Sequence, residues 1–156
     1  MNFHIELMGR EHLGGVHGIE SDCFSMPWGY QAFEEELANP LAIYVVVVVD
    51  GEVAGYAGMH HIIDEGHITN IAVAEKFRRH GFGDALVNKL IEIAQTKDMT
   101  GLTLEVRMGN AAAMRLYAKR GLMPYGIRKN YYVDTKEDAV IMWKRFKSEV
   151  AQDEKA

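Results

Sequence analysis

Residues 70–84 read NIAVAEKFRRHGFGD, and we interpret them as a strand, a tight turn and the start of a helix. Residues 71–73 are apolar and strand-like, and an amphipathic pattern follows over residues 85–94. The first amides of a helix lack backbone partners and lie at the positive end of the helix dipole, so they suit an anion. Gly81 and Gly83 would let a phosphate approach the backbone closely. The stretch therefore predicts a site for a pyrophosphate.

Two familiar phosphate-binding motifs do not fit this turn. A P-loop requires Gly-Lys-Ser/Thr, whereas Gly83 is followed by Asp84. A dinucleotide fingerprint requires a third glycine where the chain has Leu86. Arg78 and Arg79 add local positive charge. From the motif alone, a glycine-rich turn carrying solvated arginines is an equally good interpretation.

The composition is that of an ordinary globular protein, with 48% apolar and 25% charged residues among 156. We expect one domain over residues 1–147 and a flexible charged tail over residues 148–156. A net charge of -5 argues against a nucleic-acid partner. The single cysteine, Cys23, excludes an internal disulfide and a cysteine-based zinc site. The longest apolar run, residues 41–49, is too short to span a bilayer. We therefore expect a cytoplasmic protein with no membrane partner.

The elements predicted from pattern and turn residues follow the order β-α-α-β-β-β-α-β-α-β-β. This order indicates an α/β fold, with a mixed, mostly antiparallel central sheet and helices on both faces. Asp50-Gly51 is the strongest hairpin signal. The predicted strands are 3–7, 42–49, 52–62, 67–73, 102–107 and two within 123–146, and the predicted helices are 11–24, 30–38, 83–97 and 110–120.

Glu105 and Tyr117 are candidates for chemistry on the strand and helix that follow the turn. By alternation, Glu105 points away from the apolar face of its strand, although a solvated charged residue would do the same. Tyr117 lies seven residues after Asn110, on the same helix face, and an aromatic core residue would fit equally. Asn110 is a good helix N-cap in its own right.

The pattern Arg78-x-x-Gly81-x-Gly83, after an apolar strand, resembles the acetyl-CoA-binding motif of the GNAT superfamily of N-acetyltransferases. The resemblance extends over residues 3–146 and implies the GNAT fold. It narrows to the RimI branch, bacterial enzymes that acetylate the N-terminal alanine of a ribosomal protein. The segments that carry this narrower resemblance are LEVR at 104–107, NAAA at 110–113, LY at 116–117 and RKNYY at 128–132.

The resemblance also implies roles for individual residues. Glu105 would be the general base and Tyr117 the general acid that protonates the departing thiolate. The cofactor would lie between two splayed strands, with a backbone N–H near residues 71–73 facing the thioester oxygen. Trp28, Tyr131 and Tyr132 would line the groove for the acceptor peptide. The residues implied in binding acetyl-CoA are Ile71, Ala72, Val73, Arg78, Arg79, His80, Gly81, Phe82, Gly83, Asp84 and Asn110.

The chemistry of the acceptor is consistent with a carboxylate base. An α-amine has a pKa of about 7.7–8.0, against about 10.4 for lysine, so less help is needed to obtain its neutral form. Two rival hypotheses stay open: a GNAT enzyme acting on lysine side chains or a small amine, and a non-catalytic CoA-binding module. We expect no metal, although His60, His61, Asp64, Glu65 and His67 are close in sequence. We also expect direct transfer without a Cys23 nucleophile, and the oligomeric state stays undetermined.

Overall fold

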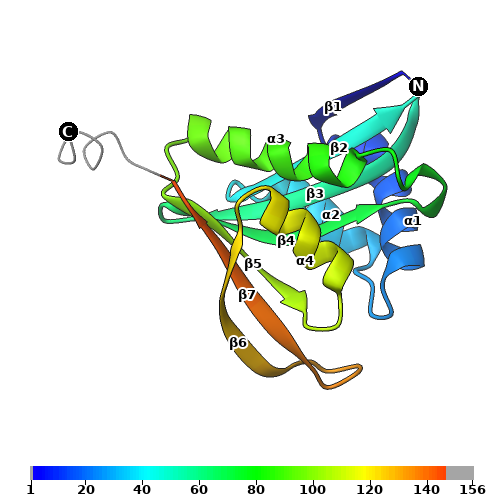
Figure 1. Cartoon of the computed structure of the whole chain (residues 1–156). Coiled ribbons are helices and arrows are strands. Elements are labelled where there is room, and N and C mark those ends of the chain that lie inside the picture. The colour runs from blue at the N-terminus through cyan, green and yellow to red at the C-terminus, as the bar shows by residue number, and fades with distance from the viewer. Residues whose placement is uncertain (1, 147–156) are drawn as a thin grey trace.

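A seven-stranded sheet forms the centre of the computed structural model, which describes residues 2–146 (Figure 1). Its strand order is β1-β2-β3-β4-β5-β7-β6, and the predicted order of strands and helices is confirmed. The predicted tail, residues 148–156, lies outside the described residues. The strands are β1 (Phe3–Leu7), β2 (Ala42–Val49), β3 (Glu52–Ile62), β4 (Glu65–Val73), β5 (Gly101–Arg107), β6 (Met123–Tyr132) and β7 (Glu137–Arg145). The helices are α1 (Leu13–Cys23), α2 (Tyr30–Ala38), α3 (Phe82–Thr96) and α4 (Ala111–Lys119), with short 3-10 turns at Arg10–His12 and Glu75–Phe77.

Strand β2 is a continuous apolar run because both of its faces are buried. Alternate side chains of Val45–Val49 enter two different cores, one under α3 and one under α1 and α2. Leu86 and Leu90 of α3 close the first core, and Phe33 of α2 closes the second. A strand covered on both faces has no solvent-facing positions, so its sequence does not alternate.

The pairing of β4 with β5 is parallel and short. It joins only Glu65–His67 to Gly101–Thr103, although β4 continues to Val73 and β5 to Arg107. Beyond His67 the two strands therefore separate and leave a wedge-shaped opening in the sheet. The splay that the family resemblance implies is thus present. Every other strand pair in the described chain is antiparallel.

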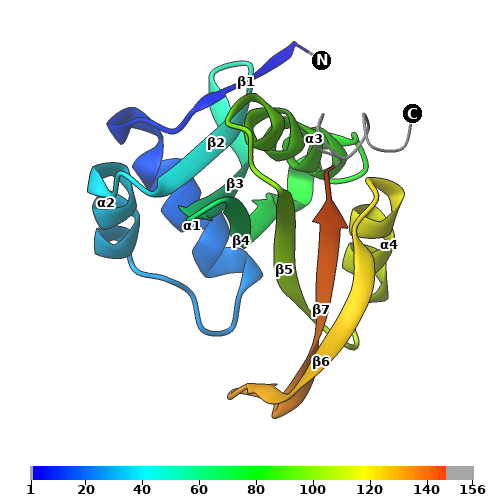
Figure 2. The same ribbon diagram turned by 90° about the vertical axis from the view of Figure 1, so that its left-hand side faces the viewer.

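The half of the sheet formed by β5, β7 and β6 carries helices on one face only. Leu102, Leu104 and Val106 are buried toward α3 and α4, as the alternation predicted. Glu105 therefore points to the opposite face, which no helix in residues 2–146 covers (Figure 2). This uncovered face, which we call the open face, is where the candidate base lies.

The helix after the anion-binding turn begins one residue earlier than predicted, at Phe82 instead of Gly83. Gly81 precedes it with φ of 79°, in the left-handed region that favours glycine. The helix predicted over residues 11–24 also differs, since Arg10–His12 form a 3-10 turn and α1 starts at Leu13. Within residues 2–146, no helix is long and apolar enough to cross a membrane.

Candidate active site

The opening between β4 and β5 contains a cleft of about 490 Å³. Its walls come from both splayed strands, the α1–α2 loop, α4 and the β6–β7 turn. The structure brings together here most of the residues singled out from the sequence. They are Trp28, Ile71, Ala72, Val73, Gly83, Glu105, Asn110, Tyr117, Tyr131 and Tyr132.

The backbone of β4 presents unpaired donors to this cleft. Ala74 N donates to Ala54 O on β3 at 2.8 Å. Antiparallel pairs alternate between bonded and non-bonded, so Ala72 faces β3 while Ile71 and Val73 direct their N–H and C=O groups away from it. Strand β5 has already diverged at this level, so these N–H groups point into the opening. They are suited to bind a carbonyl oxygen that gains negative charge.

The N-terminus of α3 adjoins the cleft and contains a second cavity of about 360 Å³. Arg78, Arg79, Gly81 and Gly83 line it together with the start of α4. The first α-helical bond is from Ala85 N to Gly81 O, so the three preceding amides have no partner within the helix. A Cβ added at Gly83 would lie 3.3 Å from Leu116 Cδ2 and would narrow this groove. The glycines, the free amides and the arginines fit a pyrophosphate.

Arg78 is fixed to the end of β4. Its Nε donates to Val73 O at 3.1 Å, and its Nη2 contacts Cys23 Sγ at 3.4 Å. Cys23 Sγ also lies 3.8 Å from Val73 O. The thiol therefore belongs to the contact between α1 and β4, beside the cationic wall of the second cavity.

Three residues of the predicted turn have side chains that point elsewhere. Phe82 is buried in the core, where its ring packs against Phe3 and Phe77. The His80 ring lies beside Phe82 rather than in either cavity. Asp84 turns toward α4 and binds the guanidinium of Arg120 through Nε at 2.6 Å and through Nη2. Only the backbone of these residues, and not their side chains, therefore lies at the N-terminus of α3.

We expect the Asp84–Arg120 pair to make the free energy of unfolding depend on pH in the acid range. The hydrogen bond from Arg120 holds the pKa of Asp84 below its usual range, although partial burial opposes this. The unfolded chain therefore binds this proton more readily, so the contribution is present above about pH 4 and is lost as pH falls through the folded pKa. Urea unfolding of wild type and Asp84→Asn should differ at pH 6, and the difference should shrink as pH falls below about 4. A difference that does not shrink in acid would contradict this assignment.

Glu105 is held in place from both sides. Its side chain is only 10% exposed, and Oε2 lies 2.8 Å from His67 Nε2. Arg128 Nε donates to Oε1 at 3.2 Å. Of the two interpretations left open by the sequence, the solvated strand-face residue is therefore wrong. His67 and Arg128 were not identified as its partners, because they come from β4 and β6 and the sequence does not give their register.

Tyr117 is half-buried on α4 and lines the cleft together with Glu105. Burial, with a smaller contribution from Tyr132, raises the pKa of Tyr117 to about 12. The phenol is thus protonated at neutral pH and can donate a proton. It also packs against the core under α3, as an aromatic core residue would.

Asn110 begins α4, and its Oδ1 accepts a hydrogen bond from Ala113 N at 3.1 Å. The N-cap role is confirmed. We expect Asn110→Ala to destabilise the protein by about 1 kcal/mol and to raise the KM for acetyl-CoA, because the start of α4 lines both cavities. Asn110→Ser should restore most of the stability, since serine also caps helices. Urea unfolding and thiol-release kinetics measure the two effects, and an unchanged KM in Asn110→Ala would contradict the cofactor role.

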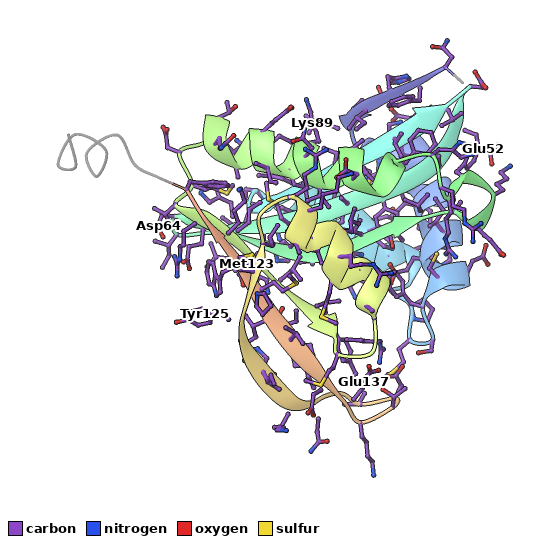
Figure 3. The ribbon with its side chains drawn as sticks, viewed as in Figure 1. Glu52, Asp64, Lys89, Met123, Tyr125 and Glu137 are labelled. Atoms are coloured by element: carbon purple, nitrogen blue, oxygen red, sulfur yellow. The ribbon has the colours of Figure 1, made fainter. Side chains whose placement is uncertain are left out.

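A polar network closes the outer end of the cleft. Arg107 donates to both carboxylate oxygens of Asp134, at 3.1 and 3.0 Å, and its guanidinium lies 4.0 Å from the centre of the Tyr132 ring. Ser25 Oγ donates to Asp134 from the α1–α2 loop. The hydrogen bonds from Ser25 and Arg107 lower the pKa of Asp134 to about 2. The neighbouring Glu137 lies at the β6–β7 turn in Figure 3.

Glu20 is a buried carboxylate that sequence reasoning missed. Its Oε2 accepts from Trp28 N at 2.9 Å, and its Oε1 accepts from Tyr56 OH and from Asn70 Nδ2, the latter at 3.3 Å. It therefore fixes the α1–α2 loop, and with it Trp28, against the splayed strand. A glutamate within a helix gives no such signal, because most helical glutamates face solvent.

The histidines close in sequence to Asp64 and Glu65 bind different partners, although His60 lies opposite His67 in register. His60 Nε2 lies 2.5 Å from Glu36 Oε2, while His67 binds Glu105. No group of three or more His, Cys, Asp or Glu in the described part of the chain could hold a metal ion.

Comparison with known proteins gives consistent matches. Residues 13–122 match the sequence model of the acetyltransferase (GNAT) family. A Bacillus subtilis protein named "Putative ribosomal protein bS18-alanine N-acetyltransferase" is 44% identical over 137 residues, 87% of this chain and 91% of that protein. The Escherichia coli ribosomal protein bS18-alanine N-acetyltransferase is 34% identical over 83% of this chain and 88% of its own. The crystal structure of the ribosomal-protein-S18-alanine N-acetyltransferase from Escherichia coli superposes with a TM-score of 0.87, at 31% identity, covering 95% and 97% of the two chains.

Proposed function

The chain belongs to the GNAT family of acetyltransferases, and on that premise we propose that it transfers acetyl from acetyl-CoA directly to the N-terminal α-amine of a ribosomal protein. One observation carries the proposal: Glu105, Tyr117 and the β4 residues Ile71 and Val73, whose N–H groups point away from β3, line the same cleft of about 490 Å³. The names of the relatives in Bacillus subtilis and Escherichia coli support the same acceptor, bS18. Such an acceptor would place the enzyme in the cytoplasm.

The two cavities would bind different parts of acetyl-CoA. Arg78, Arg79 and the free amides at the start of α3 would hold the pyrophosphate of acetyl-CoA. One extended molecule can occupy both cavities, because they share four lining residues, Val73, Gly83, Ala113 and Leu116. When bound, acetyl-CoA supplies a thioester whose acetyl group can pass to an amine. The N–H groups of Ile71 and Val73 would stabilise the negative charge that develops on its carbonyl oxygen.

Glu105 and Tyr117 would move the protons. Glu105 takes the proton that the amine loses as its nitrogen bonds to the acetyl carbon. Tyr117 donates its phenolic proton to the sulfur as the C–S bond breaks. Both residues line the same cleft, Glu105 from β5 and Tyr117 from α4.

The acceptor is tested by a panel of amines in a thiol-release assay. We expect turnover with a peptide that begins with alanine and little turnover with the same peptide blocked at its N-terminus or with a polyamine. An α-amine is about 2.5 pKa units less basic than a lysine side chain, so far more of it is neutral at pH 7. Equal rates with the free and the blocked peptide would contradict the α-amine assignment and favour a lysine acceptor. No thiol release with any amine would favour the CoA-binding module.

A further inference from the structure

Turnover leaves a proton on Glu105 that must be removed before the next cycle. This follows from the proposed function, on which the inference rests: the amine loses one proton to Glu105, and the thiolate gains one from Tyr117. Tyr117 opens into the cleft, where water can restore its proton once products leave. Glu105 is only 10% exposed, and an acceptor peptide seated beside it would cover the cleft side.

Glu105 also borders another cavity, of about 370 Å³, on the open face of the sheet. His67, Thr103, Arg128 and Trp143 are among its walls, and it shares only Glu105 with the cleft. The carboxylate thus stands between two spaces. One is the proposed substrate cleft, and the other is a separate cavity on the open face.

His67 connects Glu105 to the cavity on the open face. It is the last residue of β4 that pairs with β5, so its backbone is fixed at the apex of the splay. Its Nε2 lies 2.8 Å from Glu105 Oε2, and its side chain is 37% exposed. An imidazole can accept a proton on one nitrogen and release another from its second nitrogen, near neutral pH.

We propose that His67 carries the proton from Glu105 to water in the cavity on the open face. Before reaction the imidazole donates Nε2–H to the carboxylate, which can only accept. After Glu105 has taken the amine's proton, the exposed ring exchanges tautomers through water and Nε2 becomes the acceptor. Glu105 then passes its proton to Nε2, and Nδ1–H is released to water. One proton leaves, no electrons move, and the starting carboxylate is restored.

The charged groups around His67 have partners of their own. Arg128 Nε binds the other oxygen of Glu105 at 3.2 Å, which leaves Oε2 for the imidazole. Glu65, on the same strand, pairs with Arg145 of β7 at 3.1 Å. On β3, His60 lies opposite His67 in register but binds Glu36. The carboxylate that contacts His67 is therefore that of Glu105, the candidate base.

The experiment compares His67→Gln and His67→Ala with wild type in the thiol-release assay, using an Ala-starting peptide. Glutamine can still donate an N–H to Glu105 but cannot relay a proton. We expect both variants to lose about tenfold in kcat, less than the roughly 10²–10⁴-fold typical of removing a general base, with KM values nearly unchanged. Added imidazole should restore the kcat of His67→Ala in a dose-dependent way and leave wild type unaffected. His61→Gln, on the neighbouring strand, is the matched control and should behave as wild type.

Each other result overturns the relay. Full kcat in His67→Gln with a loss in His67→Ala would mean that His67 only positions Glu105. Losses in both variants without imidazole rescue would mean a structural role, and thermal unfolding would show it. Should His67→Ala not fold, an unchanged kcat in His67→Gln alone still rejects the proposal. Failure of the proposed function is a separate result, because it would be seen with the wild-type enzyme on the panel of amines. If wild type acetylates only lysine, the kcat ratios of the His67 variants to wild type are measured with a lysine acceptor instead.

Discussion

Replacing Glu105 with glutamine should lower kcat by about 10²–10⁴-fold, the range expected when a general base is removed. Glutamine keeps the shape of the side chain and can still contact His67 and Arg128, so the cleft should keep its form. It cannot take a proton from the amine. The amine would then have to lose its proton to water. Thiol release measured from pH 6 to 9 is the test.

The pH dependence of this variant is informative. An α-amine becomes neutral above about pH 7.7–8.0, so the residual rate of Glu105→Gln should rise through this range. Glu65→Gln is the matched control, because Glu65 lies on β4, lines the same outer cavity and pairs with Arg145 instead. An unchanged rate in Glu105→Gln across the whole pH range would remove Glu105 from the mechanism.

Features set by neighbouring residues were predictable from the sequence. Asp50 and Gly51 both have positive φ, 48° and 83°, as their hairpin signal requires. The cap at Asn110 and the inward face of β5 follow from the same kind of local rule. The turn at Gly81 was also found locally, because its backbone conformation favours glycine.

Features set by distant residues were not predictable in this way. The length of the β4–β5 pairing depends on how two strands 36 positions apart are twisted, and no local pattern records where they separate. The contact between Ser25 and Asp134 joins loops 109 positions apart. The direction of the Asp84 side chain depends on where Arg120 lies after α4 has packed. In each case the partner is chosen by tertiary packing.

Tyr117→Phe should lower kcat by about 10²-fold, because the thiolate would leave without a proton donor beside it. Burial raises the pKa of Tyr117 to about 12, so wild type keeps this proton throughout pH 6–9 and this group causes no fall in rate there. Phenylalanine fills the same space, which separates the loss of the hydroxyl from the loss of packing. Tyr125→Phe is the control, since Tyr125 is exposed on β6, away from the cleft (Figure 3).

The split between kcat and KM decides what Tyr117 does. A proton donor acts only as the C–S bond breaks, so its loss should reduce kcat while the KM for acetyl-CoA changes little. A higher KM with full kcat would make Tyr117 only a wall of the cleft. The double variant with Glu105→Gln adds a further test. If base and acid serve the same turnover, the combined loss should be smaller than the product of the two single losses, because residues that act as a unit are not additive.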